Sequence, residues 1–206
     1  ITHEKLDAGW MNKRHFIQLC ATSGVVGWQL WPDEAHEHLI LLHHGTEIMR
    51  APANAATPLM EALYQHQPEI FSGQPRLCRM SGDAYTDTPA PWISLGGSAS
   101  LADFGKVTST PPDNRRFRLN LIIETETPFE ELDWAGRIMT IGSVTLEIIE
   151  PVGRCAAINV DPDTARSDTD FLGMMRNHYN HSNLGMFARI TTAGKICCGD
   201  RYQLTS

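Results

Sequence analysis

The amino-acid sequence predicts a mainly β protein with a barrel-like core and a few short helices. Apolar residues form short, strand-sized runs, and turn residues such as Gly, Pro and Asp separate these runs. Residues 137–141 and 144–150 flank a Gly142-Ser143 turn, which is the pattern of a β-hairpin. Many short strands with only brief helices between them are typical of a β-barrel.

Hydrophobic periodicity assigns the other elements. Apolar and polar side chains alternate from residue 116 to residue 123, which predicts a strand with Arg116 and Arg118 on one face. Thr57 and Pro58 begin a helical pattern that ends near Gln67. Shorter patterns predict strands over 16–19, 38–42, 92–95, 154–160, 186–191 and 195–204, and helices over 98–104, 128–132 and 170–179, the last with Asp170 as a cap.

Composition excludes several classes of function. The chain of 206 residues carries a net charge of −7, so we expect no nucleic-acid partner. No apolar run approaches the roughly 20 residues that span a bilayer, so we expect no membrane partner. The five cysteines are odd in number and include no CxxC pair, which argues against a disulfide framework or a structural zinc site. A reducing, cytoplasmic location is therefore expected.

Four segments in the second half of the chain resemble one known family. Residues 116–120 are similar to its "RFRxN" strand, and residues 153–164 to its "xRCxxTxVDPxTG" segment. Residues 178–188 resemble "GxYAxV", and residues 194–200 resemble "GxIxxGD". Single motifs of this length recur by chance, but these four also keep the family's order and spacing. The chain thus resembles the MOSC domain family, which is named after the C-terminal part of molybdenum-cofactor sulfurases.

The resemblance implies a strongly bent MOSC-type β-barrel over residues 76–206, with residues 1–75 as part of an N-terminal β-rich subdomain. Family members bind the molybdenum cofactor (molybdopterin) or carry sulfur for it. Some reduce N-hydroxylated compounds, and in those reductases the Cys of the "RC" motif ligates molybdenum. Cys155 is the matching residue in this sequence.

The sequence also departs from the family's pattern. Fuller members begin with a "YPVKG"-type and a "DRR"-type strand, whose basic residues help to hold the pterin phosphate. Neither motif occurs here, so we expect the chain to be N-terminally incomplete relative to them. Phe187 stands where Tyr is common, and Gly96-Gly97 stands where bulkier residues are usual. These departures bear on whether the site is complete.

Cys155 is the expected catalytic residue and metal ligand. A thiolate is a soft ligand for a transition metal and can also carry a persulfide. The neighbouring Arg154 favours a thiolate electrostatically. Composition alone favours a buried structural cysteine instead, because free Cys is among the most buried residue types. The family motif reverses that preference.

The candidates for holding the cofactor are the basic and polar residues of the motifs, namely Arg118, Asn120, Arg116, Arg154, Ser98 and Ser100. Arg116 and Arg118 carry guanidinium groups, which bind phosphate in a bidentate manner, and Asn120 is expected to point the same way. Ser98 and Ser100 follow Gly96-Gly97 at an expected helix N-terminus, where backbone N–H groups favour anions. The alternatives are surface salt bridges for the arginines, a bend in the barrel for Asn120 and an ordinary turn for the serines.

Three functions fit these residues. The leading hypothesis is a reductase of small N-oxygenated compounds that binds the molybdenum cofactor and receives electrons from a separate donor protein. The second is a sulfur carrier that holds a persulfide on Cys155 and receives sulfur from a donor protein. The third is a non-catalytic binding barrel. His178 and His181 are candidate proton donors in the first case, with packing or capping as the alternative.

Overall fold

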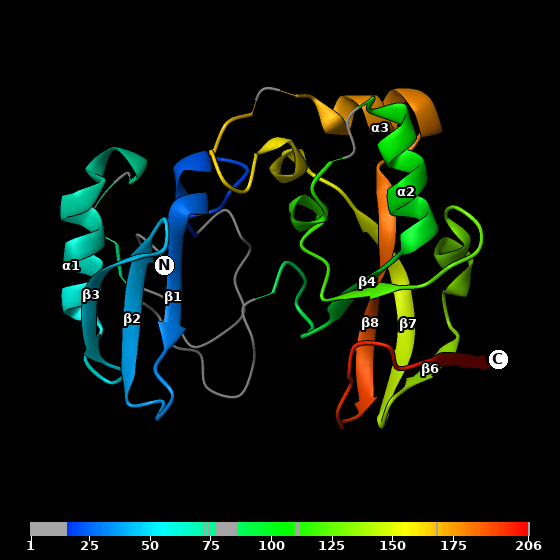
Figure 1. Ribbon diagram of the computed structural model, residues 1–206, viewed down its shortest axis with the longest axis horizontal. Coiled ribbons are helices and arrows are strands. Elements are labelled where there is room, and N and C mark those ends of the chain that lie inside the picture. Colours follow the sequence, from blue (N-terminus) through cyan, green and yellow to red (C-terminus); the bar gives the residue numbers. More distant parts are fainter. Residues whose placement is uncertain are drawn as a thin grey trace. The chain divides into compact units, whose positions relative to one another are not determined.

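The structure is a computed structural model that describes residues 16–71, 73, 75–76, 86–109, 112–167 and 169–205. Residues 1–15 of the expected N-terminal subdomain lie outside this range. The chain divides into two compact units (Figure 1). Unit 1 comprises residues 1–90 and 160–167, and unit 2 comprises residues 91–159 and 168–206.

Unit 1 is a three-stranded antiparallel sheet packed against one helix. The strands β1 (Trp28–Pro32), β2 (His38–His43) and β3 (Thr46–Pro52) follow one another in the sheet, and α1 (Thr57–His66) packs on β3. The helix begins at Thr57 as expected, although Ala56 rather than Thr57 occupies the cap position. The 3-10 helices η2 (Ser23–Gly27) and η3 (Pro68–Ile70) flank these elements. The core consists of Leu41, Ala51, Leu59, Met60 and Leu63.

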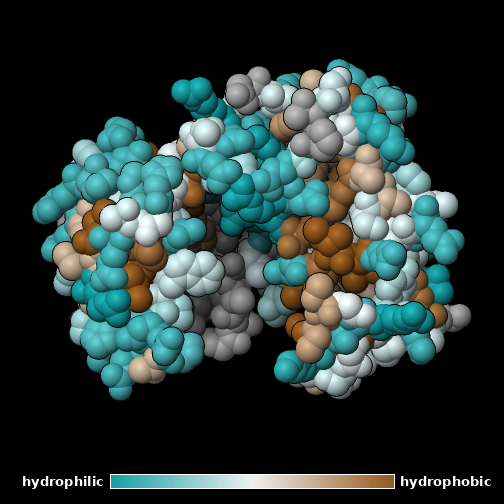
Figure 2. All heavy atoms as spheres, in the orientation of Figure 1, coloured by the Kyte–Doolittle hydropathy of each residue, from teal (hydrophilic) through white to brown (hydrophobic). Residues whose placement is uncertain are grey.

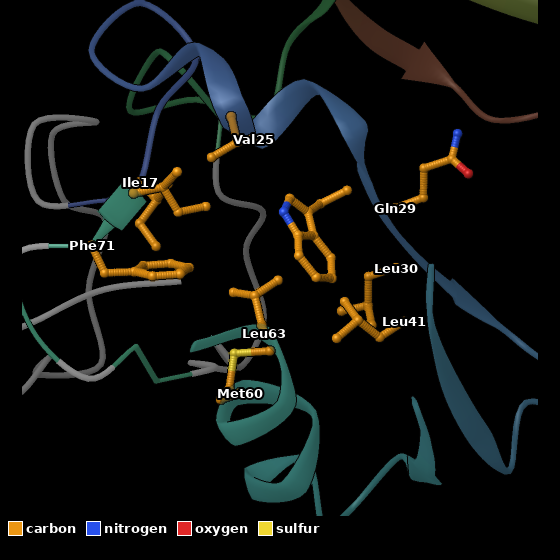
Figure 3. A pocket seen from close by; sticks show the side chains of 10 residues that line it. Ile17, Val25, Gln29, Leu30, Leu41, Met60, Leu63 and Phe71 are labelled. Carbon is orange, nitrogen blue, oxygen red and sulfur yellow. The ribbon is translucent and has the colours of Figure 1, made fainter. Parts of the chain in front are cut away.

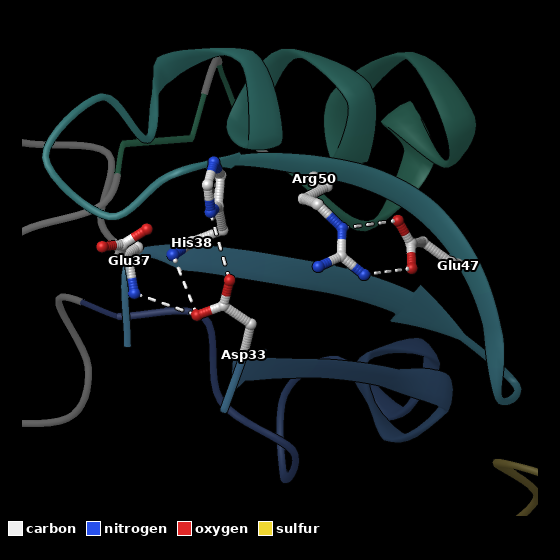
Figure 4. A network of polar contacts seen from close by, with 5 residues as sticks. All are labelled: Asp33, Glu37, His38, Glu47 and Arg50. Atoms are coloured by element: carbon white, nitrogen blue, oxygen red, sulfur yellow. Dashed lines mark hydrogen bonds and ion pairs between the residues drawn. The ribbon is translucent and has the colours of Figure 1, made fainter. Parts of the chain in front are cut away.

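Local polar contacts lie at the β1–β2 turn and on β3 (Figure 4). At the β1–β2 turn, the Asp33 carboxylate accepts hydrogen bonds from the backbone N–H groups of Glu37 and His38, at 2.9 and 3.2 Å. Its second oxygen lies 3.1 Å from Nδ1 of His38. On β3, Arg50 donates two hydrogen bonds to Glu47. The Asp33 contacts close the β1–β2 turn, whereas the exposed Glu47–Arg50 pair lies within β3 and contributes little to stability.

Three histidines gather around one tryptophan in unit 1. The His43 ring stacks on Trp28 with centroids 4.4 Å apart, and His44 and His66 lie 4.4 and 4.9 Å from His43. Burial lowers the pKa of His43 below its ordinary value of 6.5, and the charges of His44 and His66 lower it further. The folded state therefore favours the neutral His43 ring.

Unit 2 is built on a six-stranded sheet in the order β5-β4-β8-β7-β6-β9. Its strands are β4 (Ile93–Gly97), β5 (Leu121–Ile123), β6 (Ile138–Ile141), β7 (Val144–Gly153), β8 (Asn183–Thr192) and β9 (Tyr202–Thr205). Only the β4–β5 pair is parallel. The register between β7 and β8 shifts at three places, and such bulges bend and twist a strand.

The sheet is consequently curled into a half-barrel, which confirms the predicted mainly β class. In the described part of the chain, β5 and β9 form its two edges. Ten buried residues fill its concave core, among them Leu95, Met139, Leu146 and Met186.

Helices α2 (Ser98–Val107) and α3 (Phe171–Tyr179) lie side by side at one end of this sheet (Figure 1). The Asp170 carboxylate accepts a hydrogen bond from Gly173 N–H at 3.0 Å, which confirms the predicted cap. Phe104, Phe117 and Phe171 join a second core between these helices and the loops. No helix among the described residues is long and apolar enough to cross a membrane.

Four predicted strands are wrong in whole or in part. The expected strand over 16–19 does not form, because only Phe16 makes an isolated bridge and residues 19–21 form a turn. Residues 114–117 form the 3-10 helix η4 (Asn114–Phe117), which Asp113 caps and which ends where Arg118 takes a left-handed conformation with φ 49°. Of the strand expected over 116–123, only residues 121–123 therefore pair. Residues 156–159 form the 3-10 helix η6 (Ala156–Asn159) rather than part of a strand. Of the expected strand over 195–204, only the end from Tyr202 pairs, as β9. Alternation of side chains alone does not reveal these bends.

A buried carboxylate fixes the start of α2. Glu131, in the 3-10 helix η5 (Glu130–Trp134), is fully buried and accepts hydrogen bonds from Gly97 N–H at 3.2 Å and from the Ser100 hydroxyl at 2.7 Å. The Ser100 oxygen in turn accepts a hydrogen bond from Phe129 N–H at 2.8 Å. A carboxylate at a helix N-terminus is favourable because it satisfies free N–H groups and opposes the helix dipole.

We expect acidification to destabilise unit 1. Because the folded state lowers the pKa of His43, it binds fewer protons than the unfolded state. The stabilisation is present above about pH 6.5 and is lost as the pH falls through the folded pKa. Thermal unfolding between pH 8 and pH 5 should show this loss in the parent and a smaller loss in His43→Phe, which keeps a ring on Trp28. His36→Asn, at an exposed turn, is the control and should behave like the parent.

We also expect Gly97→Ala to destabilise unit 2 by about 1–3 kcal/mol. A Cβ atom at Gly97 would lie 2.6 Å from Oε2 of Glu131 and 2.8 Å from Oγ1 of Thr125, so the buried network must shift. At Gly153 the nearest atom to such a Cβ is 3.8 Å away, so Gly153→Ala is the matched control. Urea unfolding of both variants measures the difference. Equal stability of the two variants would show that the network accommodates the methyl group.

Candidate functional site

Cys155 lies where the longest strand pair of unit 2 ends. The last paired residue of β7 is Gly153, and the backbone N–H of Arg154 donates to the carbonyl of Ser182 at 2.7 Å. The Cys155 carbonyl then accepts a hydrogen bond from Ile158 N–H at 3.2 Å, which begins η6. The Cys155 thiol is free and half-buried. It therefore stands at a fixed point of the backbone while remaining accessible.

Arg154 is held by backbone carbonyl oxygens on two other segments. Its Nε donates to Leu184 at 2.8 Å and its Nη1 donates to Phe117 at 2.7 Å, and Nη2 also contacts the Leu184 oxygen. Burial lowers the pKa of Arg154 to about 10, while the charges of Cys155 and Glu131 act in the opposite direction. Arg154 thus remains cationic at neutral pH beside the Cys155 thiol.

The hydrogen bond from Arg154 to Phe117 joins two segments that carry predicted site residues. Cys155 follows Arg154, and Arg118 follows Phe117, so this hydrogen bond brings the two segments together. Arg118 is exposed, and its left-handed backbone marks the bend after η4. Within the described part of the chain, no hydrogen bond or ion pair engages its guanidinium group. Arg118 is accordingly available to an anion.

Arg116 has a different position from the predicted one. It is only 9% exposed, and its guanidinium donates to the carbonyl oxygens of Ile158 and Asn159, at 3.4 and 3.0 Å. It also lies over the Phe171 ring, 4.9 Å from the centroid. Because residues 114–117 are helical, the expectation that Arg116 and Arg118 share a strand face is wrong. Arg116 ties η4 to η6 and α3.

Asn120 connects the same bend to β4. Its side-chain oxygen accepts hydrogen bonds from Ser94 N–H at 2.9 Å and from the Ser94 hydroxyl at 3.1 Å. Its backbone N–H donates to the Ser94 carbonyl at 2.9 Å. These contacts match the alternative in which Asn120 satisfies a bend in the barrel. A role in binding a cofactor stays a prediction for this residue.

Ser98 and Ser100 lie at the N-terminus of α2, as expected, but the protein itself uses their hydroxyl groups. Ser100 is fully buried between Glu131 and Phe129. The Ser98 oxygen accepts a hydrogen bond from Thr125 N–H at 3.2 Å, and Oγ1 of Thr125 accepts one from Ala99 N–H at 3.0 Å. No hydrogen bond among the described residues links the two serines to Cys155 or Arg118. Their part in cofactor binding stays a prediction.

Sequence reasoning missed Glu131 and Thr125, which together occupy the free N–H groups of α2. Both residues lie in a polar segment that no recognised motif covers, so the sequence gives no sign of their role.

Ser98 also lines an open pocket of about 470 Å³ along α2, with Ala102, Gly105 and Ile122 in its wall. Figure 2 shows hydrophobic residues gathered on the face of unit 2 that carries α2 and β4. Ile122 is 49% exposed there.

Aromatic residues surround the loop that pairs with the Cys155 segment. The Tyr179 hydroxyl donates to the Asp103 carboxylate at 2.8 Å, and burial raises the pKa of Tyr179. Phe129 meets Tyr179 and His181 edge-on, with ring centroids 4.6 and 5.4 Å apart. His181 accepts a hydrogen bond at Nδ1 from Asn183 N–H at 3.1 Å and directly precedes Ser182, the backbone partner of Arg154.

No group of three or more His, Cys, Asp or Glu side chains among the described residues could hold a metal ion. Of the predicted site residues, Cys155, Arg154 and Arg118 lie on segments that the Arg154–Phe117 hydrogen bond links. Arg116 and Asn120 contribute to packing and to bends of the backbone. Ser98 and Ser100 lie at the start of α2.

Comparison with known proteins relates this chain to one family. A 51-residue stretch is 43% identical to molybdenum cofactor sulfurase from Danio rerio, and it spans 25% of this chain but only 6% of that protein. The crystal structure of YiiM from Geobacillus stearothermophilus is 17% identical, with a TM-score of 0.42 over 55% of this chain and 54% of that one. The model of the MOSC domain matches residues 92–203, which is more than half of the chain. The chain therefore belongs to the MOSC domain family.

Proposed function

We propose that this chain binds the molybdenum cofactor, with Cys155 as the protein ligand of molybdenum, and takes part in the reduction of small N-oxygenated compounds. One observation carries the proposal. The Arg154–Phe117 hydrogen bond links the segment of a half-exposed thiol to that of an exposed, unengaged arginine in unit 2. Metal and phosphate are the two parts of a metallopterin that a protein must hold.

The chemistry of these side chains supports this assignment. A thiolate is a soft ligand that suits a transition metal, and Cys155 stands beside the cationic Arg154. Arg118 can bind a phosphate through two parallel hydrogen bonds. Arg116 and Arg154 instead use their guanidinium groups on backbone carbonyls, so they support the site rather than bind the cofactor. Arg118 is thus the phosphate ligand in this proposal.

The bound cofactor would supply two-electron redox chemistry. In the proposed reaction, R–NH–OH takes up two electrons and two protons and yields R–NH₂ and water as the N–O bond breaks. A separate donor protein supplies the electrons. His181 is the candidate to hold a proton, because its loop pairs with the Arg154 backbone. Phe129 and Tyr179, which contact His181, would exclude water around it.

A second candidate function is sulfur transfer through a persulfide on Cys155. The similarity of a short stretch to molybdenum cofactor sulfurase favours it. This function needs an accessible thiol and a sulfur-donor protein, but it needs no phosphate ligand. The two functions therefore differ in what they require of Arg118.

We expect Cys155→Ser to lose molybdenum. The chain is purified from a host that makes the cofactor, and metal content is measured by elemental analysis. The parent should carry near-stoichiometric molybdenum, whereas Cys155→Ser should carry only background because a hydroxyl is a harder and weaker ligand. Cys198→Ser, at an exposed turn of the same unit, is the control and should keep the metal. Equal molybdenum in parent and Cys155→Ser would refute the ligand assignment.

We expect Arg118→Ala to weaken cofactor retention by about tenfold or more, because a charge-assisted hydrogen bond contributes roughly 1.5–3 kcal/mol. Arg118→Lys should restore part of this loss, since Lys offers a point charge without the bidentate geometry. Cofactor remaining after gel filtration is the measurement, and Arg201→Ala, an exposed arginine of unit 2, is the control. Persulfide on Cys155 with no effect of Arg118 would favour the sulfur carrier.

A further inference from the structure

An apolar cavity of about 180 Å³ lies in unit 1, between α1 and the first strands of its sheet. Figure 3 shows Leu30 and Leu41 on one side of the hollow and Phe71 on the other, with Leu63 and Met60 below, and Trp28 also lines it. The single polar residue at its edge, Gln29, points away from it (Figure 3). The cavity thus offers hydrocarbon and aromatic carbon to any occupant.

The walls of this cavity are fixed by contacts outside it. The Trp28 indole donates its one N–H to the side chain of Gln67 at 2.8 Å and stacks its ring on His43. Leu41, Met60 and Leu63 are each at most 3% exposed and belong to the core of unit 1. Because Trp28 already has its hydrogen-bond partner, an occupant gains nothing from carrying an acceptor there. The cavity therefore selects against polar ligands.

The size of the cavity indicates the size of the ligand. Protein interiors are close-packed, and few of their voids exceed one water molecule. A cavity of roughly 150 Å³ lined by apolar side chains stays dry and binds benzene or xenon. The pocket in unit 1 is slightly larger and has similar apolar walls, and it is partly open to solvent. It matches one six-membered ring with at most a small substituent.

We infer that unit 1 holds a binding site for a small, uncharged, apolar compound of about one aromatic ring. Trp28 and Phe71 line the site with aromatic rings, and Val25, Leu41 and Leu63 contribute methyl groups. This site lies entirely within unit 1 and does not depend on the molybdenum chemistry proposed for unit 2. Aromatic rings favour edge-to-face or offset contacts, so a flat ligand has partners on two sides.

Titration of the full chain with benzene tests this site. Methyl groups of Val25, Leu41, Leu63 and Met60 should shift in a saturable manner in methyl NMR spectra, while methyl groups of unit 2 should not. Xenon, as a second probe, should shift the same set. The absence of saturable shifts at these four residues, or equal shifts throughout the protein, would overturn the proposal.

A cavity-filling variant makes the test specific. Val25→Phe, in η2 at the rim, should fill the space and weaken benzene binding by at least tenfold. Should that variant unfold, Val25→Leu adds one methylene group and should weaken binding to a smaller extent. Met174→Phe, at a 38% exposed position on α3, is the matched control and should bind benzene like the parent. Unchanged binding by a folded Val25 variant would place the ligand elsewhere and refute the inference.

Discussion

The hydrogen bonds of Arg154 hold the functional half of this molecule together. Its guanidinium bridges the carbonyl oxygens of Leu184 and Phe117, so one side chain fixes the end of β7, the start of β8 and the bend after η4. A buried cation is costly unless hydrogen bonds satisfy it, and backbone carbonyls provide them here without neutralising its charge. The positive charge of Arg154 therefore persists beside Cys155, and the carbonyl oxygens of Leu184 and Phe117 fix its position.

The buried side chain of Glu131 acts electrostatically on this cation. Glu131 is fully buried, caps α2 through Gly97 and Ser100, and lies within electrostatic reach of Arg154. The two groups explain why the loops of unit 2 take fixed conformations despite their lack of regular structure. The left-handed Phe129 is one such case, because its N–H is held by Ser100. Strained backbone of this kind persists only where its surroundings determine it.

Much of the fold could be predicted from the sequence, because strong local signals specify it. The hairpin around Gly142-Ser143 and the helix capped by Asp170 depend on neighbouring residues, and both are confirmed. The bend at Arg118 could not be predicted, since the alternation of residues 116–123 fits a strand as well as it fits a bent loop. The partners of Arg116 lie more than 40 positions away in the sequence, so no local pattern reveals them.

The same distinction applies to the candidate site. The "RC" motif pointed to Cys155, and the sequence proposed both Arg116 and Arg118 as phosphate ligands, with the better motif match at Arg118. The structure separates them, because a guanidinium bound to two carbonyl oxygens has few donors left for a ligand. Arg118 alone among the predicted arginines keeps its donors, so the choice between the two proposed functions rests on this residue. A sulfur carrier needs only the thiol of Cys155. A pterin phosphate would explain why Arg118, whose segment is hydrogen-bonded to that of Cys155, has no partner of its own among the described residues.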